Sequence, residues 1–247
     1  MKKRIIFIAA FFLFISKINA QQIFLNKVSI EYAKTVAVPQ LVKELEPQWY
    51  DRVKDRLPKE TVGYYNFSSD GNKSIYKRTK EAVMPRNIGL PLMADENIVY
   101  NDYTTGTTIT QKPIYEETYL LQDSLLNIKW KITADTRTIA GFECRKAIGI
   151  LFDTVSVFAF YTDEIMVNGG PEGINGLPGM ILGVGIPRLH ITWFATKVNI
   201  ATDAEVKSIA PASKGSKTSR RKMIIDLDKA MKSWGGWGSK IALAFMI

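Results

Sequence analysis

The sequence predicts a mainly β protein, built as a curved antiparallel sheet or half-barrel with one or two short helices. Three observations lead to this fold class. Apolar and polar residues alternate in many short segments, glycines and prolines separate the segments, and aromatic residues stand on both sides of the late segments. Because the turns between successive strands are short, we expect neighbouring strands to pair antiparallel.

The first twenty residues have the pattern of a secretory signal peptide. Met1–Arg4 is basic, Ile5–Ile15 is an unbroken apolar run, and Ser16–Ala20 is polar and ends in a small residue. The apolar run is too short to span a bilayer comfortably, so we expect cleavage before Gln21 and a periplasmic or secreted protein with no transmembrane segment after cleavage. Residues 1–20 carry four basic residues and no acid, so their removal lowers the formal charge from +9 to +5.

Residues 21–247 predict a single β-rich domain, since their number suffices for a sizeable core and no internal repeat is visible. Cys144 is the only cysteine, which excludes an intramolecular disulfide and any multi-cysteine metal site in this sequence. Its place in a strand pattern predicts a small buried residue rather than a nucleophile.

The first part of this domain predicts strands around one broken helix. Residues 21–38 alternate as one long strand or a strand pair. Val62–Phe67 and Ser74–Arg78 flank Asp70-Gly71 and predict a hairpin, while Met84–Glu96 has no steady period and predicts a loop. Between them, four-residue spacing of apolar residues predicts a short amphipathic helix that is interrupted or started near Pro47, on Leu41, Leu45, Trp49, Val53 and Leu57.

The middle of the chain predicts a meander. Its strands are expected at Ile98–Tyr103, Thr107–Gln111 and Ile114–Leu121, separated by Gly106 and Pro113. A half-buried strand follows, because apolar Ile128, Trp130 and Ile132 alternate with polar residues.

The late segments continue the antiparallel pattern. A turn is expected at Asp135–Gly141, with strands at Phe142–Leu151, Val155–Tyr161 and Leu189–Ile200. Residues 202–221 are rich in serine, lysine and alanine and predict a flexible basic loop.

The C-terminal region predicts a second short helix with the apolar positions Met223, Leu227, Ala230, Met231 and Trp234. The following apolar tail, Ile241–Ile247, is too short to span a membrane, and we interpret it as an edge strand or as the product of an altered reading frame.

Glycines concentrate in one stretch, Gly169–Gly185, which holds seven of the seventeen glycines of the chain. Proline fixes φ near −65° and glycine accepts positive φ, so Pro178 and Gly179 predict a type II turn that leads into a strand at Met180–Val184. We expect the backbone shape to matter most at four positions, Gly170, Gly176, Pro178 and Gly179.

Several motifs together resemble the GLPGLI family of secreted Bacteroidota proteins, with Met180 in place of the usual leucine. They are Trp130–Ile132, Ile139–Ala147, Phe160–Ile165, Gly170-Pro171 and Gly176–Leu182. The resemblance covers most of the mature chain. It implies an exported β-rich domain, often found beside outer-membrane uptake systems and similar to the domain preceding some secreted glycoamidases. It implies no established activity.

The residues that carry common chemistries do not form a complete set in this sequence. No Lys-Ser or Lys-Thr follows the glycines in Walker spacing. His190 is the sole histidine, without a nucleophile elbow or ligand spacing, and predicts a structural or surface residue. We therefore expect no cofactor and no metal. Export and the lack of clustered aromatic and basic motifs oppose nucleic-acid binding.

Two functions remain, and the first is a binding or interaction module without catalysis. Loops on a rigid sheet commonly carry recognition, so we predict that Pro171, Glu172, Asn175 and Leu177 touch an envelope protein or an apolar ligand. The competing interpretation of the same glycines is a tight, closely packed connection between strands.

The second function is a hydrolase of glycan or peptide. Asp163, Glu164 and Glu172 lie beside the glycine-rich turn, and two carboxylates near one cleft could do acid–base work. Solvated loop acids would explain the same residues without any chemistry.

Overall fold

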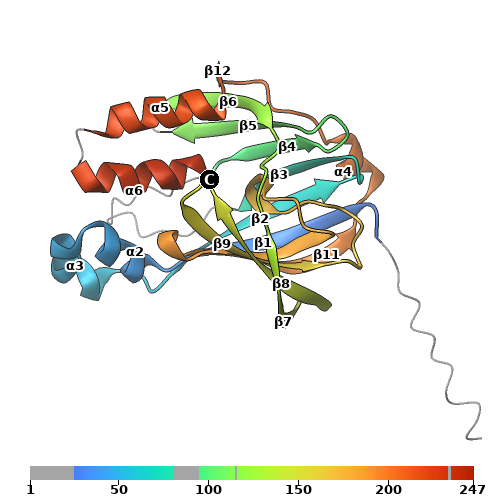
Figure 1. Cartoon of the computed structure of the whole chain (residues 1–247), viewed down its shortest axis with the longest axis horizontal. Helices are drawn as coiled ribbons and strands as arrows, with labels where there is room; N and C mark the ends of the chain where they lie inside the picture. Colours follow the sequence, from blue (N-terminus) through green and yellow to red (C-terminus); the bar gives the residue numbers. More distant parts are fainter. Residues whose placement is uncertain (1–24, 81–94, 115, 233–234) are drawn as a thin grey trace, which may run out of the picture.

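One curved sheet forms the body of the protein, and this confirms the predicted fold class (Figure 1). The computed structural model describes residues 25–80, 95–114, 116–232 and 235–247. The predicted signal peptide lies outside these residues, as does nearly all of the predicted loop Met84–Glu96. The twelve described strands follow the order β12-β6-β5-β4-β3-β2-β1-β11-β10-β9-β8-β7, and only the short β12 pairs in parallel.

The strands of the sheet are β1 Val28–Val36, β2 Thr61–Ser69, β3 Lys73–Lys80, β4 Ile98–Asp102, β5 Thr107–Ile114, β6 Glu117–Ser124, β7 Lys131–Ile139, β8 Phe142–Leu151, β9 Val155–Thr162, β10 Met180–Ile186, β11 Ile191–Ile200 and β12 Ser216–Thr218. The described α-helices are α2 Val38–Leu45, α3 Pro47–Val53, α4 Asp203–Lys207, α5 Arg220–Met231 and α6 Gly235–Met246. Three single-turn helices accompany them, η1 Lys54–Arg56, η2 Pro171–Gly173 and η3 Pro187–Leu189.

Strand β1 lies at the centre of the sheet and joins two meanders. Its first residue, Val28, stands opposite Ser69 of β2 on one side and opposite Ile200 of β11 on the other. Strands β2 to β6 follow one another on the first side, and β11 to β7 follow on the second. The strands within each meander are therefore close in sequence, whereas β1 and β11, whose pairing joins the two meanders, are far apart in sequence.

The inner face of the sheet carries large aromatic side chains. Trp193, Tyr32, Tyr65 and Tyr76 are among the largest fully buried residues. The rings of Tyr65 and Tyr76 stack with centroids 5.2 Å apart, and Tyr32 meets Tyr76 edge to face. Such pairs add to the stability that burial of the rings supplies.

The opposite face also carries aromatic rings, as the sequence predicts. Phe194 follows Trp193 in β11 and points to the other side, because successive strand residues alternate. Its ring lies 6.3 Å from that of Phe160, which in turn lies 6.0 Å from Phe158. The Arg137 guanidinium lies 4.6 Å from the centroid of the Phe194 ring, within the range of a cation–π contact.

The predicted broken helix is confirmed as α2 and α3, which meet at Glu46 directly before Pro47. Proline has no backbone N–H and suits the first turn of a new helix, so the second helix starts there. The buried residues of α2 are Val38, Leu41, Val42 and Leu45.

Two local predictions in the middle of the chain are wrong. Residues 131–139, which include most of the expected turn Asp135–Gly141, form strand β7, and the turn is confined to Ala140-Gly141. Strand β7 is an edge strand, exposed over most of its length, so it needs no alternation of apolar residues. The second wrong prediction is the half-buried strand on Ile128, Trp130 and Ile132. Ile128 and Trp130 precede β7 in a loop, where the Trp130 indole donates a hydrogen bond to the Asn175 carbonyl oxygen.

The C-terminal region contains more regular structure than the sequence predicts. The predicted basic loop near 202–221 includes α4, β12 and the start of α5. Residues Ile241–Met246 belong to α6, which corrects the edge-strand interpretation of the apolar tail. Among the described residues, every helix is too short or too polar to cross a membrane.

Cys144 and His190 have structural positions. Cys144 is fully buried, as predicted, and burial raises the pKa of its thiol to about 12, so it stays protonated at neutral pH. His190 follows η3 with a φ of 52°, and its Nε2 lies 2.8 Å from Glu44 Oε2, which ties η3 to helix α2.

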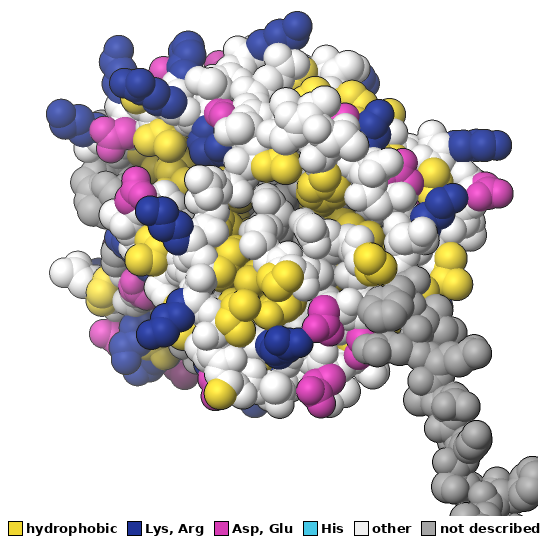
Figure 2. Space-filling view, turned by 45° about the vertical axis from the view of Figure 1, so that its right-hand side comes forward, with side chains coloured by type: hydrophobic (Ala, Val, Ile, Leu, Met, Phe, Trp, Pro, Cys, Tyr) yellow, Lys and Arg dark blue, Asp and Glu magenta, His cyan; other side chains and the backbone are white. Residues whose placement is uncertain are grey.

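The surface seen in Figure 2 is mixed. Hydrophobic side chains gather in patches around its hollowed middle, and side chains of both charges are interspersed, many of them toward the outline. Interspersed charges are typical of a solvated surface.

Candidate functional site

The glycine-rich connection between β9 and β10 packs into the interior. Its single turn η2 lies against β3 and β4. A Cβ at Gly169 would overlap the hydroxyl of Tyr103 and approach the ring of Phe67, so the backbone passes closely over these side chains. The Gly169 carbonyl oxygen accepts a hydrogen bond from Ile181 N at 2.9 Å. This packing supports the interpretation of the glycines as a closely packed connection between strands.

The predicted turn at Pro178 is present in a tighter form. Gly179 has a φ of 134°, which confirms the predicted positive φ, and Gly176 has a φ of 93°. The Gly179 N–H donates to the Leu177 carbonyl oxygen at 2.9 Å, which closes a three-residue turn instead of the four-residue type II turn. Gly170 has an extended backbone and is buried.

All four residues predicted to touch a partner are buried. Glu172, Asn175 and Leu177 expose 5%, 7% and 2% of their surface, and Pro171 is buried as well. They form no exposed contact patch. Their role in binding stays a prediction, and their burial restricts it to a molecule that reaches the interior.

Two of these residues shape the connection itself. Asn175 donates from Nδ2 to the Gly173 carbonyl oxygen at 2.8 Å and accepts from Trp130 Nε1 at 2.9 Å on its own carbonyl oxygen. Leu177 belongs to the main hydrophobic core.

Glu172 is the chemically distinctive residue of the connection. Its φ of 53° lies in the left-handed region, which is strained for a residue with a Cβ. Its Oε2 accepts a hydrogen bond from Asn97 Nδ2 at 2.9 Å, whereas Oε1 is buried without a partner among the described residues. Burial raises the pKa of this carboxyl, and the nearby Lys34 and Lys112 ammonium groups oppose that rise.

Lys112 enters the same region from strand β5. It is buried, and its Nζ donates to the Ile247 carbonyl oxygen at 2.7 Å, which Asn97 Nδ2 also approaches at 3.3 Å. Burial lowers the pKa of Lys112 to about 8, although the Glu172 carboxylate acts in the other direction. A buried carboxyl and a buried ammonium with shifted pKa values thus share one environment.

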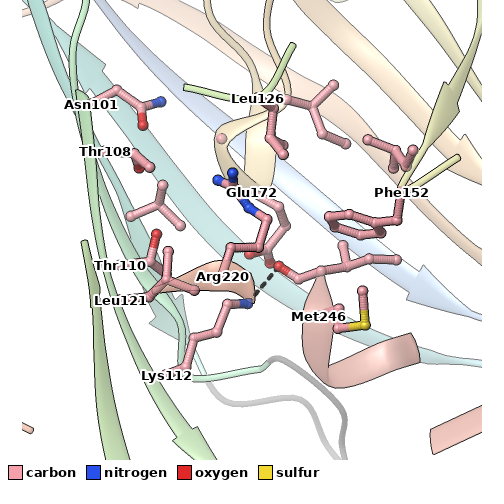
Figure 3. Close-up of a pocket in the computed structure, with 15 residues that line it drawn as sticks. Asn101, Thr108, Thr110, Lys112, Leu121, Leu126, Phe152, Glu172, Arg220 and Met246 are labelled. Carbon is pink, nitrogen blue, oxygen red and sulfur yellow. Dashed lines mark hydrogen bonds between the residues drawn. The ribbon is translucent and has the colours of Figure 1, made fainter. Parts of the chain in front are cut away.

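These side chains line a pocket, shown in Figure 3. The pocket has a cavity of about 30 Å³, enough for one or two water molecules. Its polar lining includes Glu172, Lys112 and Arg220 together with Asn101, whose buried Oδ1 also has no partner among the described residues. Its apolar lining comes from strands β4, β6 and β8, from segments that follow strands, from the glycine-rich connection and from the C-terminal residues. These residues are Val99, Leu121, Leu126, Leu151, Phe152, Ile174, Met246 and Ile247.

A second buried group, Lys34 with Asp95, contributes to the electrostatic field at this site. Lys34 Nζ lies 3.1 Å from Asp95 Oδ1, and the Tyr65 hydroxyl donates to the Asp95 carbonyl oxygen at 3.0 Å. The Lys34 ammonium also lies 5.4 Å from the Trp193 ring. Its charge opposes the rise in the pKa of Glu172 and contributes to the fall in the pKa of Lys112.

The three acids considered for hydrolysis lie in different environments. Asp163 is exposed, and its Oδ2 lies 2.7 Å from Arg145 Nη2. Glu164 is half-buried, and its main-chain oxygen accepts from Leu25 N. Glu172 alone of the three lines the pocket, and it is the only acidic side chain among the described lining residues. Within the described part of the chain, no three His, Cys, Asp or Glu side chains are grouped to hold a metal ion.

Sequence reasoning identified Glu172 but missed Lys112, Asn101 and Asn97. The available signal was the alternation in β5, where Thr108, Thr110 and Lys112 share one face with the buried Ile114. A lysine on the buried face of a strand is unusual enough to indicate a site.

Part of the chain matches a family model. The model described as "Protein of unknown function (Porph_ging)" matches residues 149–183, from the end of β8 to the start of β10. This stretch contains η2, Glu172 and the Pro178-Gly179 turn. The resemblance to the GLPGLI family itself stays a prediction. No curated protein matches the sequence.

Two solved structures of PNGF-II resemble the fold. They have TM-scores of 0.52 with 13% and 14% identity, and they match 88% and 83% of this chain. The alignments cover 33% and 34% of PNGF-II, so this chain corresponds to about a third of that protein. An uncharacterised conserved protein from Thermus thermophilus aligns over 78% of this chain and 90% of its own, with a TM-score of 0.38 and 5% identity. At these identities the likeness to PNGF-II concerns the fold alone.

Proposed function

We propose that the protein is an exported binding module whose interior pocket receives a ligand, and that it does no chemistry on that ligand. One observation carries the proposal. Glu172 Oε1 and Asn101 Oδ1 are buried acceptors without a partner among the described residues, and both residues line the pocket that Lys112 enters. Burying an unpaired acceptor costs about 1–3 kcal/mol, which a bound donor group would offset.

The pocket supports binding better than hydrolysis. Acid–base cleavage of a glycoside uses two acidic side chains on opposite sides of the bond, and Glu172 is the only acidic side chain among the described lining residues. The hydrolase is a second candidate because burial raises the pKa of Glu172, as a general acid requires.

Export is part of the proposal. The basic start and the short apolar run of residues 1–20 support a cleaved signal. The motifs that resemble the GLPGLI family support an envelope protein accessory to outer-membrane uptake. The occurrence of the fold as about a third of PNGF-II supports a module that works with other parts.

Processing of the N-terminus tests the export step. We expect the protein recovered outside the cytoplasm to begin at or near Gln21, since Ala20 is the small residue that ends the polar region. N-terminal sequencing or intact mass measurement checks this result. Recovery of material that retains Met1 outside the cytoplasm would contradict it.

Ligand binding is tested by thermal melting with the small-molecule fraction of an envelope extract from the host. We expect this fraction to raise the melting temperature of the parent, because a ligand that binds only the folded state stabilises it. Lys112→Met and Glu172→Gln should each lose the rise, since each removes a charged group of the pocket.

Lys131→Met is the matched control, because Lys131 is an exposed lysine at the start of β7. It should retain the full rise. No rise in the parent, or an equal rise in both pocket variants, would contradict binding at this site. Mass spectrometry of the same mixtures tests the hydrolase: a component consumed by the parent and spared by Glu172→Gln would favour that candidate.

A further inference from the structure

The last turn of helix α6 occupies part of the pocket. Met246 and Ile247 line it, and the dashed line from Lys112 in Figure 3 marks the hydrogen bond from its Nζ to the Ile247 main-chain oxygen. That oxygen accepts from Lys112 Nζ at 2.7 Å and from Asn97 Nδ2 at 3.3 Å. The protein therefore already holds one main-chain oxygen with a charged and a neutral donor.

The polar atoms of the pocket complement a peptide group. Lys112 and Asn97 supply donors for a carbonyl oxygen, while Glu172 Oε1 and Asn101 Oδ1 are acceptors that lack donors among the described residues. A peptide backbone presents one C=O and one N–H per residue, so a bound segment could use both kinds of group. A fatty acid would supply only acceptors when ionised and would leave Glu172 and Asn101 unpaired.

The rest of the lining suits apolar side chains. Leu121, Leu126 and Phe152 face the same pocket as Met246. The stretch Ile241–Ile247, which reaches the pocket through Met246 and Ile247, contains no charged side chain. The end of α6 and Ile247 thus offer apolar side chains to the apolar lining and a main-chain oxygen to Lys112 and Asn97.

Helix α6 depends on a close approach to α5. The two helices pack against each other, and a Cβ at Gly238 would overlap the carbonyl oxygen of Met231, the last residue of α5. A single methyl group at this position must therefore move α6 relative to α5.

From the main-chain oxygen held by Lys112 and Asn97 and from the two unpaired acceptors, we propose that the pocket binds an apolar peptide segment. The end of α6, with Ile247 after it, is a resident occupant which such a peptide displaces. The inference rests on the proposed binding function and specifies its ligand class.

The test uses the full chain and a fluorescent synthetic peptide that repeats Ala244–Ile247 between lysine and glycine flanks, with capped ends. Fluorescence anisotropy measures its binding. We expect Gly238→Ala to bind the peptide at least about tenfold more tightly than the parent, because loosening α6 raises the fraction of molecules with a free pocket. Adding Lys112→Met to Gly238→Ala should reverse the gain, since it removes the main donor to the carbonyl.

Gly106→Ala is the control, because a Cβ at Gly106 has no neighbour within 4 Å, so the added methyl group displaces nothing near it. It should bind like the parent. A peptide with the same residues in scrambled order, and decanoate as a competitor, should bind at least about tenfold more weakly than the probe. Binding by Gly238→Ala that is no tighter than the parent, or that survives Lys112→Met, would overturn the inference.

Hydrogen exchange of the parent provides a second measurement if Gly238→Ala does not fold. At a saturating peptide concentration, the amides of α6 should exchange faster, because displacement exposes them; unchanged exchange at saturation would overturn the inference. The two proposals can fail separately. If the envelope fraction raises the melting temperature but the peptide does not bind, the result would support the binding module and contradict a peptide as its ligand.

Discussion

Gly179→Val is expected to lower the free energy of unfolding by about 3–5 kcal/mol. Two effects act together. Gly179 has a φ of 134°, which a β-branched residue resists, and a Cβ at this position would overlap the carbonyl oxygen of Thr162 on the neighbouring strand β9. The obstacle is main chain inside a paired sheet, so it has little freedom to give way. Urea unfolding followed by tryptophan fluorescence measures the loss.

Met180→Leu is the control for this turn. Met180 is fully buried next to Gly179, and the exchange nearly conserves volume, so it should cost less than about 1.5 kcal/mol. If the two variants unfold at the same urea concentration, the argument from the turn is wrong.

Lys112→Met is expected to change how stability depends on pH. The pKa of Lys112 falls from 10.5 to about 8 in the folded protein, chiefly through burial, with Lys34 and Arg220 adding to the fall and Glu172 opposing it. Between these two values the unfolded chain holds a proton that the folded chain has released. Raising the pH across this range therefore stabilises the folded parent, by ~3 kcal/mol in total.

Lys112→Met has no ammonium group at this position, so it does not gain stability in this way as the pH rises. Its stability relative to the parent should therefore be greatest near neutral pH. The free energy of unfolding of the variant minus that of the parent should fall by ~3 kcal/mol between about pH 7 and pH 10.5. Unfolding curves at several pH values provide both numbers. Lys131→Met, at an exposed position, should follow the parent throughout. A difference between Lys112→Met and the parent that stays constant over this range would exclude the buried ammonium as its source.

Local patterns predicted most of the sheet. Strand β8 has the predicted bounds Phe142–Leu151, and the hairpin of β2 and β3 turns at the predicted Asp70-Gly71. Both depend on alternation and turn residues within a few positions of each other, which a sequence displays directly. The same rule failed at β7, because a strand exposed at the sheet edge has no buried face to mark it.

The candidate site depends on contacts that no local pattern contains. Glu172 meets Asn97 across 75 positions, and Lys112 meets Ile247 across 135. Alternation alone would place Ile109 inward in β5, yet Ile109 is only half-buried and its neighbours Thr108 and Thr110 are buried. The face of β5 that carries Thr108, Thr110 and Lys112 lines the pocket together with Glu172, and this pocket forms only when segments distant in sequence come together.

The central position of β1 has a consequence for how the chain folds. The meanders β2–β6 and β7–β11 can each form from neighbouring segments, but β1 must pair with β11, whose residues lie more than 150 positions further along the chain. Folding is slow when so long a loop must close before any contact compensates for the loss of chain entropy. β1, the first of the described strands, is therefore among the last to be fully paired. Until β11 has emerged, the second edge of β1 is open to chaperones or to other chains.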